Sequence, residues 1–129
     1  MTEQGSGAGT AGYGLTVRWS LRDAPPDAAA RLREYVVGTS LARFSGTPGL
    51  RYKVWRMIEG EWFEGLYVWS TAAARDAFEA SFRPGADDSP GSLIVGAGPQ
   101  VIEPFEVVAV AAGEAGFTTG PGPGRASAS

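Results

Sequence analysis

The segment from residue 50 to residue 69 constrains the fold most, because it carries large apolar side chains at odd and at even positions. Its two halves, 50–59 and 62–69, predict two strands. Gly60 and Glu61 between them predict a two-residue hairpin turn with glycine first. In that register Val54 is expected opposite Tyr67.

This register predicts a hairpin that is apolar on both faces. One face carries Leu50, Tyr52, Val54, Ile58, Phe63, Tyr67 and Trp69. The other carries Trp55, Met57, Trp62, Leu66 and Val68, with Lys53 and Glu64 among them. Helices can cover one side of such a sheet, and a bare second side would expose more apolar surface than soluble monomers usually do. We therefore expect a second copy to pack sheet against sheet in a twofold homodimer.

The rest of the chain predicts one strand, a helix, the hairpin, a second helix and a last strand. Residues 15–21 alternate apolar and polar, and the helix that follows Pro25 and Pro26 is expected to run to about Phe44. Its buried face is expected to comprise Ala28, Leu32, Tyr35, Val36 and Thr39. Residues 72–82 predict the second helix, and 101–111 a strand that Pro104 places at an edge or bulge. This order predicts an α+β, ferredoxin-like βαββαβ fold with both helices on one sheet face.

The two ends of the chain differ from its middle in composition. Residues 1–12 and 112–129 are mostly Gly, Ala, Ser, Thr and Pro, so we expect flexible tails around one domain over 13–111. Phe117 is the one large side chain that could dock the second tail.

The absence of Cys, His and Asn excludes several classes of site. There can be no disulfide, zinc–thiolate or iron–sulfur site, no His-ligated haem and no Ser-His-Asp triad. The net charge of −3, with ten scattered arginines and one lysine, disfavours nucleic-acid binding. Residues 1–14 lack the pattern of a signal peptide, and no apolar run reaches the ~20 residues of a membrane span. We expect a cytoplasmic protein, and the Arg-rich, Ala- and Gly-rich composition suggests a bacterial one.

Two cationic residues of the hairpin are the candidates for catalysis. Lys53 is the only lysine and lies between apolar neighbours. Burial would lower the pKa of its amino group, which could then act as a base or, when protonated, as a cation that stabilises a phenolate. The alternative is a side chain that reaches solvent or pairs with Glu64. Arg56, expected on the face of Tyr52 and Tyr67, could hold an anionic substrate oxygen or form a salt bridge at the rim.

The substrate-binding candidates are aromatic residues whose polar atoms need partners when buried. They are Trp19, Tyr35, Tyr52, Trp55, Tyr67 and Trp69. A flat aromatic ligand in an apolar pocket would use such groups, although for any one of them core packing is the more common role.

The hairpin residues also resemble a known family. Residues 48–55, PGLRYKVW, followed by 64–69, EGLYVW, and an Ala-rich helix, resemble the YdhR-like monooxygenases of the dimeric α+β-barrel superfamily, which includes antibiotic biosynthesis monooxygenases. The resemblance implies a dimer whose sheets form a barrel and a small hydrophobic pocket between sheet and helices. It also implies oxidation of electron-rich phenols by O2 without a cofactor.

The positions that match the family's motif are Lys53, Trp55, Tyr67 and Trp69. The Asn and His that serve some relatives are absent, and Glu64 stands where many relatives have Gly. Three functions stay open at this point: a cofactor-independent monooxygenase for an aromatic or polyketide-type molecule, a cyclase or isomerase of a natural-product pathway, and a non-catalytic small-molecule-binding dimer.

Overall fold

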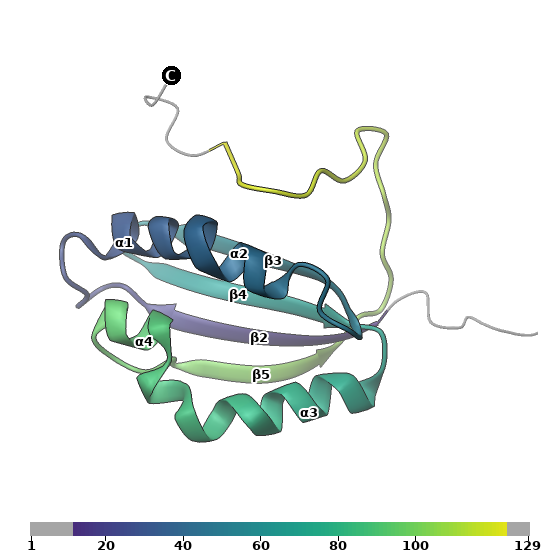
Figure 1. The fold of residues 1–129 in the computed structure, drawn as a ribbon, viewed down its shortest axis with the longest axis horizontal. Coiled ribbons are helices and arrows are strands. Elements are labelled where there is room, and N and C mark those ends of the chain that lie inside the picture. Colours follow the sequence, from purple (N-terminus) through teal and green to yellow (C-terminus); the bar gives the residue numbers. More distant parts are fainter. Residues whose placement is uncertain (1–11, 124–129) are drawn as a thin grey trace, which may run out of the picture.

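The computed structural model describes residues 12–123 (Figure 1). Its regular elements, in chain order, are β2 (Tyr13–Ser20), α1 (Ala28–Tyr35), the π-helical turn η1 (Val36–Ser40), α2 (Leu41–Phe44), β3 (Leu50–Ile58), β4 (Trp62–Trp69), α3 (Ala72–Phe82), the 3₁₀ segment η2 (Arg83–Asp88), α4 (Pro90–Val95) and β5 (Val101–Glu106). The short helix α4 adds one element to the predicted order.

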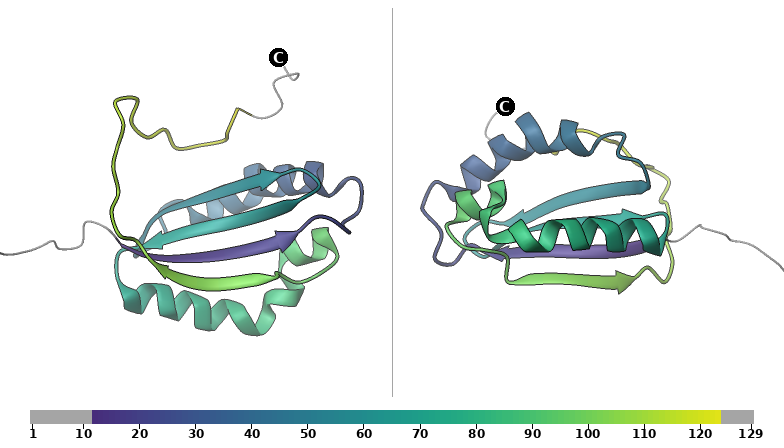
Figure 2. Two further views of the ribbon diagram at one scale, coloured as in Figure 1. Left: turned by 180° about the vertical axis from the view of Figure 1, so that it is seen from behind. Right: turned by 60° about the horizontal axis from the view of Figure 1, so that its bottom comes forward.

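The four strands form one antiparallel sheet in the order β3-β4-β2-β5. All the helices lie on one face of this sheet, and the view from behind shows the other face without a helix over it (Figure 2). The chain order and the strand order together confirm the expected α+β, ferredoxin-like fold. We call the helix-covered side the inner face and the opposite side the outer face.

The inner face of the sheet holds the core. Leu15, Val17 and Trp19 of β2 alternate with more exposed residues and are almost completely buried, as the period of two predicts. Leu32 of α1 and Ile94 of α4 pack into the same cluster. Thr71 caps α3 by accepting a hydrogen bond from the Ala74 amide at 3.0 Å.

The first helix is interrupted by the π-helical turn over Val36–Ser40. A π turn inserts one extra residue, so the inward-facing position is displaced by one residue along the chain. Thr39 is therefore exposed and Ser40 is buried, and the expectation that Thr39 belongs to the buried face is wrong. The same displacement brings Phe44 onto the core.

The hairpin register also differs from the expected one. The turn contains three residues rather than two, because Ile58 pairs with Trp62 and the Glu61 amide donates to the Ile58 carbonyl at 2.9 Å. Gly60 supplies the positive φ of 78° that this turn requires. As a result Lys53, not Val54, lies opposite Tyr67. The predicted composition of the two faces is therefore wrong: Lys53 belongs to the inner face and Glu64 to the outer face.

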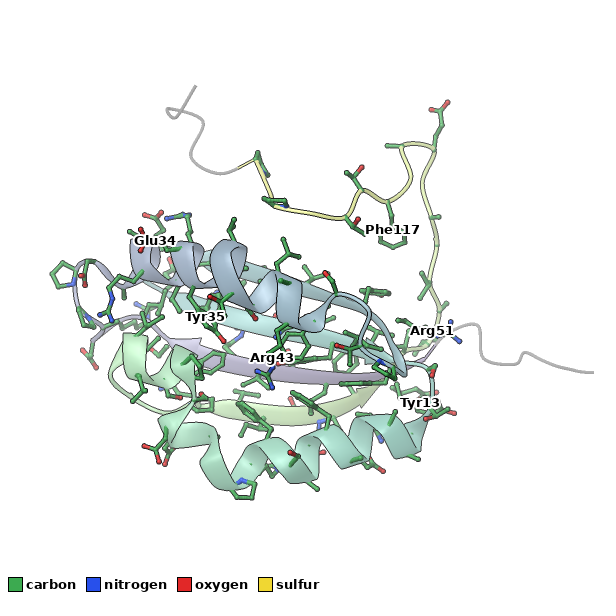
Figure 3. All side chains as sticks on the ribbon, viewed as in Figure 1. Tyr13, Glu34, Tyr35, Arg43, Arg51 and Phe117 are labelled. Atoms are coloured by element: carbon green, nitrogen blue, oxygen red, sulfur yellow. The ribbon has the colours of Figure 1, made fainter. Side chains whose placement is uncertain are left out.

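The last strand ends at Glu106, five residues before the predicted boundary, and residues 107–123 that follow it have no regular secondary structure. Pro104 lies in an edge strand, as predicted. The ring of Phe117 lies 5.7 Å from the ring of Tyr52, and Figure 3 shows Phe117 pointing toward the β3 side of the sheet. The tail predictions for residues 1–11 and 124–129 lie outside the described residues.

Among residues 12–123, no helix is long and apolar enough to cross a membrane.

Candidate functional site

A cavity of about 270 Å³ lies over the inner face of the sheet, between the α1–α2 segment and the α3–α4 segment. Its aromatic walls are Trp19, Tyr35, Phe44, Trp55, Phe63, Tyr67, Phe78 and Phe82, and its polar side chains are Ser40, Arg43, Lys53, Ser81 and Ser89. Figure 3 shows Tyr35 and Arg43 projecting from the α1–α2 segment toward the side on which α3 and α4 lie. The arrangement is an apolar cleft with a few polar groups, which is typical of a small-molecule site.

Lys53 and Tyr67 form the polar centre of this cavity. The Lys53 Nζ donates a hydrogen bond to the Tyr67 Oη over 2.8 Å. The three-residue turn creates this pair, because it places the two residues opposite each other on neighbouring strands. Gly65 leaves room for the lysine chain, since a Cβ at that position would lie 3.2 Å from the Lys53 Cε.

Aromatic rings surround the Lys53 amino group. The Nζ lies 3.7 Å from the ring centroid of Phe44, 4.2 Å from that of Tyr67 and 4.7 Å from that of Trp55. The rings of Phe44 and Phe78 lie 5.6 Å and 4.7 Å from that of Tyr67, so the tyrosine itself is held by packing. The amino group is therefore fixed at the end of a strand-borne side chain rather than on a mobile loop.

The electrostatics of the cavity favour an uncharged amine. Burial, and secondly the positive charge of Arg43, lower the Lys53 pKa from 10.5 to about 6. The ring faces favour the ammonium form, but the loss of hydration outweighs them. Burial also raises the pKa of Tyr67 well above its usual value, a shift that Tyr35 adds to and Arg43 opposes. At neutral pH the pair is thus an amine beside an un-ionised phenol.

No carboxylate lines this cavity within the described part of the chain. Arg43 from α2, Tyr67 from β4 and Tyr35 from α1 are the titratable groups that face Lys53. The predicted alternative of a Lys53–Glu64 ion pair is wrong, since the two side chains lie on opposite faces of the sheet. An unpaired amine near neutrality has the properties of a general base.

The structure brings five of the predicted site residues to the cavity: Lys53, Trp19, Tyr35, Trp55 and Tyr67. The indole N–H of Trp19 already donates to the Ser92 Oγ at 2.9 Å, so only its ring faces the cavity. Trp69 is buried in the core and does not line this cavity, and its indole N–H has no hydrogen-bond partner among residues 12–123.

Two predicted residues lie elsewhere. Tyr52 is on the outer face and lines a second cleft. Arg56 is also on the outer face, opposite Glu64, so the expectation that it shares a face with Tyr67 is wrong. Since Arg56 points away from the cavity, the geometry gives it no contact with a substrate held there.

Arg56 instead belongs to a polar cluster centred on Glu64. The Glu64 carboxylate is 2% exposed and accepts hydrogen bonds from Arg56, from the Thr16 hydroxyl at 2.8 Å and from the Arg18 Nε at 3.2 Å. Burial alone would raise the Glu64 pKa, but the hydrogen bonds from Arg56 and Thr16 and the two positive charges lower it overall. The Arg18 guanidinium also lies over the ring of Trp62, at 4.2 Å. This cluster stabilises the outer face.

The second cleft, of about 620 Å³, lies between the α1–α2 segment, the edge strand β3 and residues 117–122. It shares Phe44, Lys53 and Trp55 with the first cavity. Lys53 therefore lines both spaces.

Sequence reasoning missed four residues that line the cavity: Arg43, Phe44, Phe78 and Phe82. Phe44 makes the shortest ring contact with Lys53, and Arg43 carries the nearest charge of the cavity. Phe44 and Arg43 reach the cavity because the π turn displaces the end of the first helix by one residue. No feature of the apolar pattern in the sequence marks that displacement.

No protein-family model matches the chain, and no curated protein matches it. Among solved structures, it is similar to NE2512, a protein of unknown function from Nitrosomonas europaea, with a TM-score of 0.58, 18% identity, and coverage of 81% of this chain and 96% of that chain. A proposed antibiotic biosynthesis monooxygenase from Chloroflexus aurantiacus aligns with a TM-score of 0.43, 16% identity, and coverage of 78% and 96%. PA3566 from Pseudomonas aeruginosa aligns with a TM-score of 0.44, 16% identity, and coverage of 81% and 100%.

The similarity to NE2512 shows that the chain shares its fold with a solved protein. At this level of identity it shows the fold alone. What the chain does has to be argued from its own cavity.

Proposed function

We propose that this chain is a small enzyme of the antibiotic-biosynthesis-monooxygenase type, of the YdhR-like group, that oxidises an aromatic or polyketide-type molecule without a cofactor. The observation that carries the proposal is the Lys53–Tyr67 pair inside an aromatic cavity. The name of the Chloroflexus aurantiacus protein agrees with this activity, and the PGLRYKVW motif agrees with the group.

The cavity suits a flat ring system of modest size. Its volume of about 270 Å³ lies just below the range of roughly 300–1,000 Å³ that small-molecule sites usually occupy. Aromatic rings line it on several sides, so a planar substrate gains contact area and leaves little room for water beside the reacting group. The adjoining cleft can hold any part of the substrate that extends beyond the ring system.

Lys53 is the base in this proposal. Its neutral amine takes the proton of a phenol or of an activated CH₂ group, and the resulting ammonium and Arg43 stabilise the substrate anion. Tyr67 is a positioning residue, because its hydroxyl holds the Lys53 Nζ in place. The electron-rich anion then reacts with O2: an activated CH₂ becomes C=O and the second oxygen atom leaves as water.

Oxygen uptake with a panel of phenols and anthrone-like compounds, without added flavin or metal, tests the proposal. We expect uptake that falls at least about 100-fold in Lys53→Met. Arg56→Met is the matched control, because this cation lies on the opposite face of the sheet, and it should keep most of the activity. Absence of uptake across the panel would contradict the oxidation.

A cyclase or isomerase is the second candidate, and the same pair supports it. A base and an un-ionised phenol 2.8 Å apart can remove a proton from one atom and return it to another without oxygen. Product mass separates the two functions: an oxidation adds about 14 or 16 mass units, while a cyclisation or isomerisation leaves the mass unchanged or removes water. Ligand binding without any turnover would instead indicate a non-catalytic binder.

We also propose that the outer face is the interface of a homodimer. It carries Tyr52, Val54, Ile58, Trp62, Leu66 and Phe105 around the Glu64 cluster, and no helix covers it (Figure 2). Val54 and Ile58 are 42% and 47% exposed, which is unfavourable for a sheet face left in water.

Sedimentation velocity at micromolar concentration tests the dimer. The wild-type chain should sediment as a dimer, and Leu66→Glu, on the outer face, should sediment as a monomer. Leu93→Glu is the matched control, because Leu93 is 66% exposed on α4 at the helical side and should leave the dimer intact. A wild-type monomer would contradict the interface.

A further inference from the structure

The Lys53 amino group has a feature that the proposed oxidation does not require: it is a nucleophile without a counter-ion. Among the residues the structure describes, its one hydrogen-bond partner is a neutral hydroxyl, and no carboxylate lines the cavity around it. A lysine in an ion pair has its lone pair occupied by a proton, whereas a desolvated lysine beside another cationic group is an activated nucleophile. Arg43 is that second cation here.

We propose that Lys53 is a covalent attachment site for small aromatic aldehydes and ketones, which its amino group captures as an imine inside the cavity. The ligand class follows from the walls. Phe44, Trp55 and Tyr67 surround the Nζ at 3.7–4.7 Å from their ring centroids, so a carbonyl group attached to a flat ring can reach the nitrogen while the ring packs among them. Arg43 can pair with a phenolate or carboxylate substituent of the same ring.

The chemistry needs no reagent beyond the carbonyl compound. The Nζ lone pair forms a bond to the carbonyl carbon, and the C=O electron pair moves to oxygen, which takes the proton of the Tyr67 hydroxyl. The nitrogen returns a proton to Tyr67 and gives a carbinolamine. The hydroxyl of the carbinolamine then takes the proton of Tyr67 and leaves as water while the nitrogen lone pair forms the C=N bond, and the nitrogen gives its remaining proton back to the Tyr67 oxygen. Aldehyde and amine are thus converted into imine and water, with no change in oxidation state.

Tyr67 is placed for these proton transfers. Its Oη lies 2.8 Å from the Nζ, so one hydroxyl is within reach of both the nitrogen and an oxygen bound to the same carbon. Its pKa is raised by burial, so it remains protonated and able to donate at neutral pH. The apolar surroundings disfavour return of water to the imine.

The capture uses the cavity of the proposed function but not its reaction. A chain that shows no oxygen uptake can still form the imine, and an oxidising chain can fail to form it. Failure of one proposal can therefore be distinguished from failure of the other, because one is measured as turnover and the other as a covalent mass change.

Reductive trapping tests the site directly. The wild-type chain is incubated at pH 7 with benzaldehyde and sodium cyanoborohydride, and labelled peptides are identified by mass spectrometry. Lys53 is the only lysine, so the only other primary amine is the N-terminal one, which serves as an internal reference. We expect Lys53 to be labelled at least about 100-fold faster in the native chain than in the same chain in urea, because an ordinary lysine is almost entirely protonated at pH 7.

Two variants separate the chemistry from mere exposure of an amine. Tyr67→Phe should slow the native labelling of Lys53 by about 10-fold or more, because the proton donor is lost. Tyr13→Phe, which removes the hydroxyl of a 42% exposed tyrosine that lines neither cleft, should leave the rate unchanged. Labelling of Lys53 that is no faster in the native chain than in urea, or labelling confined to the N-terminal amine, would overturn the proposal.

Discussion

Lys53 and Tyr67 lie directly opposite each other on β3 and β4, and the lysine Nζ donates to the tyrosine Oη over 2.8 Å. The pair sits on the helix-covered face, where burial shifts the pKa of both groups away from their charged forms; the charge of Arg43 adds to the shift of Lys53 and opposes that of Tyr67. Base chemistry and carbonyl capture at this cavity both depend on this one contact.

The first prediction concerns stability and pH. The Lys53 pKa is about 6 in the folded chain and 10.5 in a solvated lysine, so between these values the unfolded chain binds one more proton than the folded one. Wild-type stability therefore falls as pH decreases from 10.5 toward 6. Lys53→Met has no amino group to deprotonate on folding, so it should be more stable than the wild type by on the order of a few kcal/mol at pH 6. This gap in the free energy of unfolding should close by pH 10.5. Urea unfolding of both chains across this range measures the gap; a gap that does not change with pH would contradict the shift.

The second prediction concerns the hydrogen bond itself. Tyr67→Phe should destabilise the fold by about 1 kcal/mol, because the buried lysine loses its acceptor. The same substitution in the Lys53→Met background should cost much less, which gives a coupling of about 1 kcal/mol in a double-mutant cycle. Tyr52→Phe combined with Lys53→Met is the control, and these two changes should add. Full additivity of the Tyr67 and Lys53 changes would show that the contact is absent.

The third prediction concerns the outer face. Glu64→Gln should destabilise the fold by about 2 kcal/mol at pH 7, because Arg18 and Arg56 lose a buried carboxylate. Since the Glu64 pKa is lowered on folding, its contribution is complete above the ordinary value of 4.5 and is lost as pH falls through the folded value. The difference between the two chains in urea unfolding should therefore shrink in acid. Glu103→Gln, an exposed residue of the same face, should change stability by less than about 0.5 kcal/mol.

The fourth prediction concerns the space beside the lysine. In Gly65→Ala, the new Cβ would lie 3.2 Å from the Lys53 Cε and 3.5 Å from the Tyr67 ring, so the lysine chain has to move. We expect a loss of about 1 kcal/mol in stability and at least about 10-fold weaker binding of a flat aromatic ligand, measured by calorimetry. Gly38→Ala is the matched control, because its Cβ meets no atom within 4 Å. Equal binding by both variants would show that the ligand lies elsewhere.

The parts of the fold that could be predicted are those in which one face alone is apolar. The alternation of β2 fixes which side chains are buried, and Thr71 marks the start of α3. The hairpin could not be placed in this way. Its strands are apolar on both faces, so a shift of one residue leaves the apolar pattern nearly unchanged, and the turn around Gly60 alone decides the register.

That single shift also determined how much of the site could be predicted. Lys53, Trp55 and Tyr67 were recognised as candidates, but the predicted register separated Lys53 from Tyr67 and assigned Arg56 to the wrong face. Phe44 reaches the cavity only because the π turn displaces the end of the first helix. The three-residue turn around Gly60 and the π turn over Val36–Ser40 are both local backbone conformations, and the apolar periodicity of the sequence does not predict them.

The most direct test of the account is the titration of Lys53 itself. Because the chain contains one lysine, protein made with ¹³C-labelled lysine gives one Cε resonance, which can be followed by NMR from pH 5 to 11 without assignment. The account predicts a midpoint near pH 6 in the folded chain, against 10.5 for a solvated lysine such as that of the chain in urea. A folded-state midpoint above about 9 would mean a charged, solvated lysine and would contradict both its role as a base and its capture of carbonyl compounds.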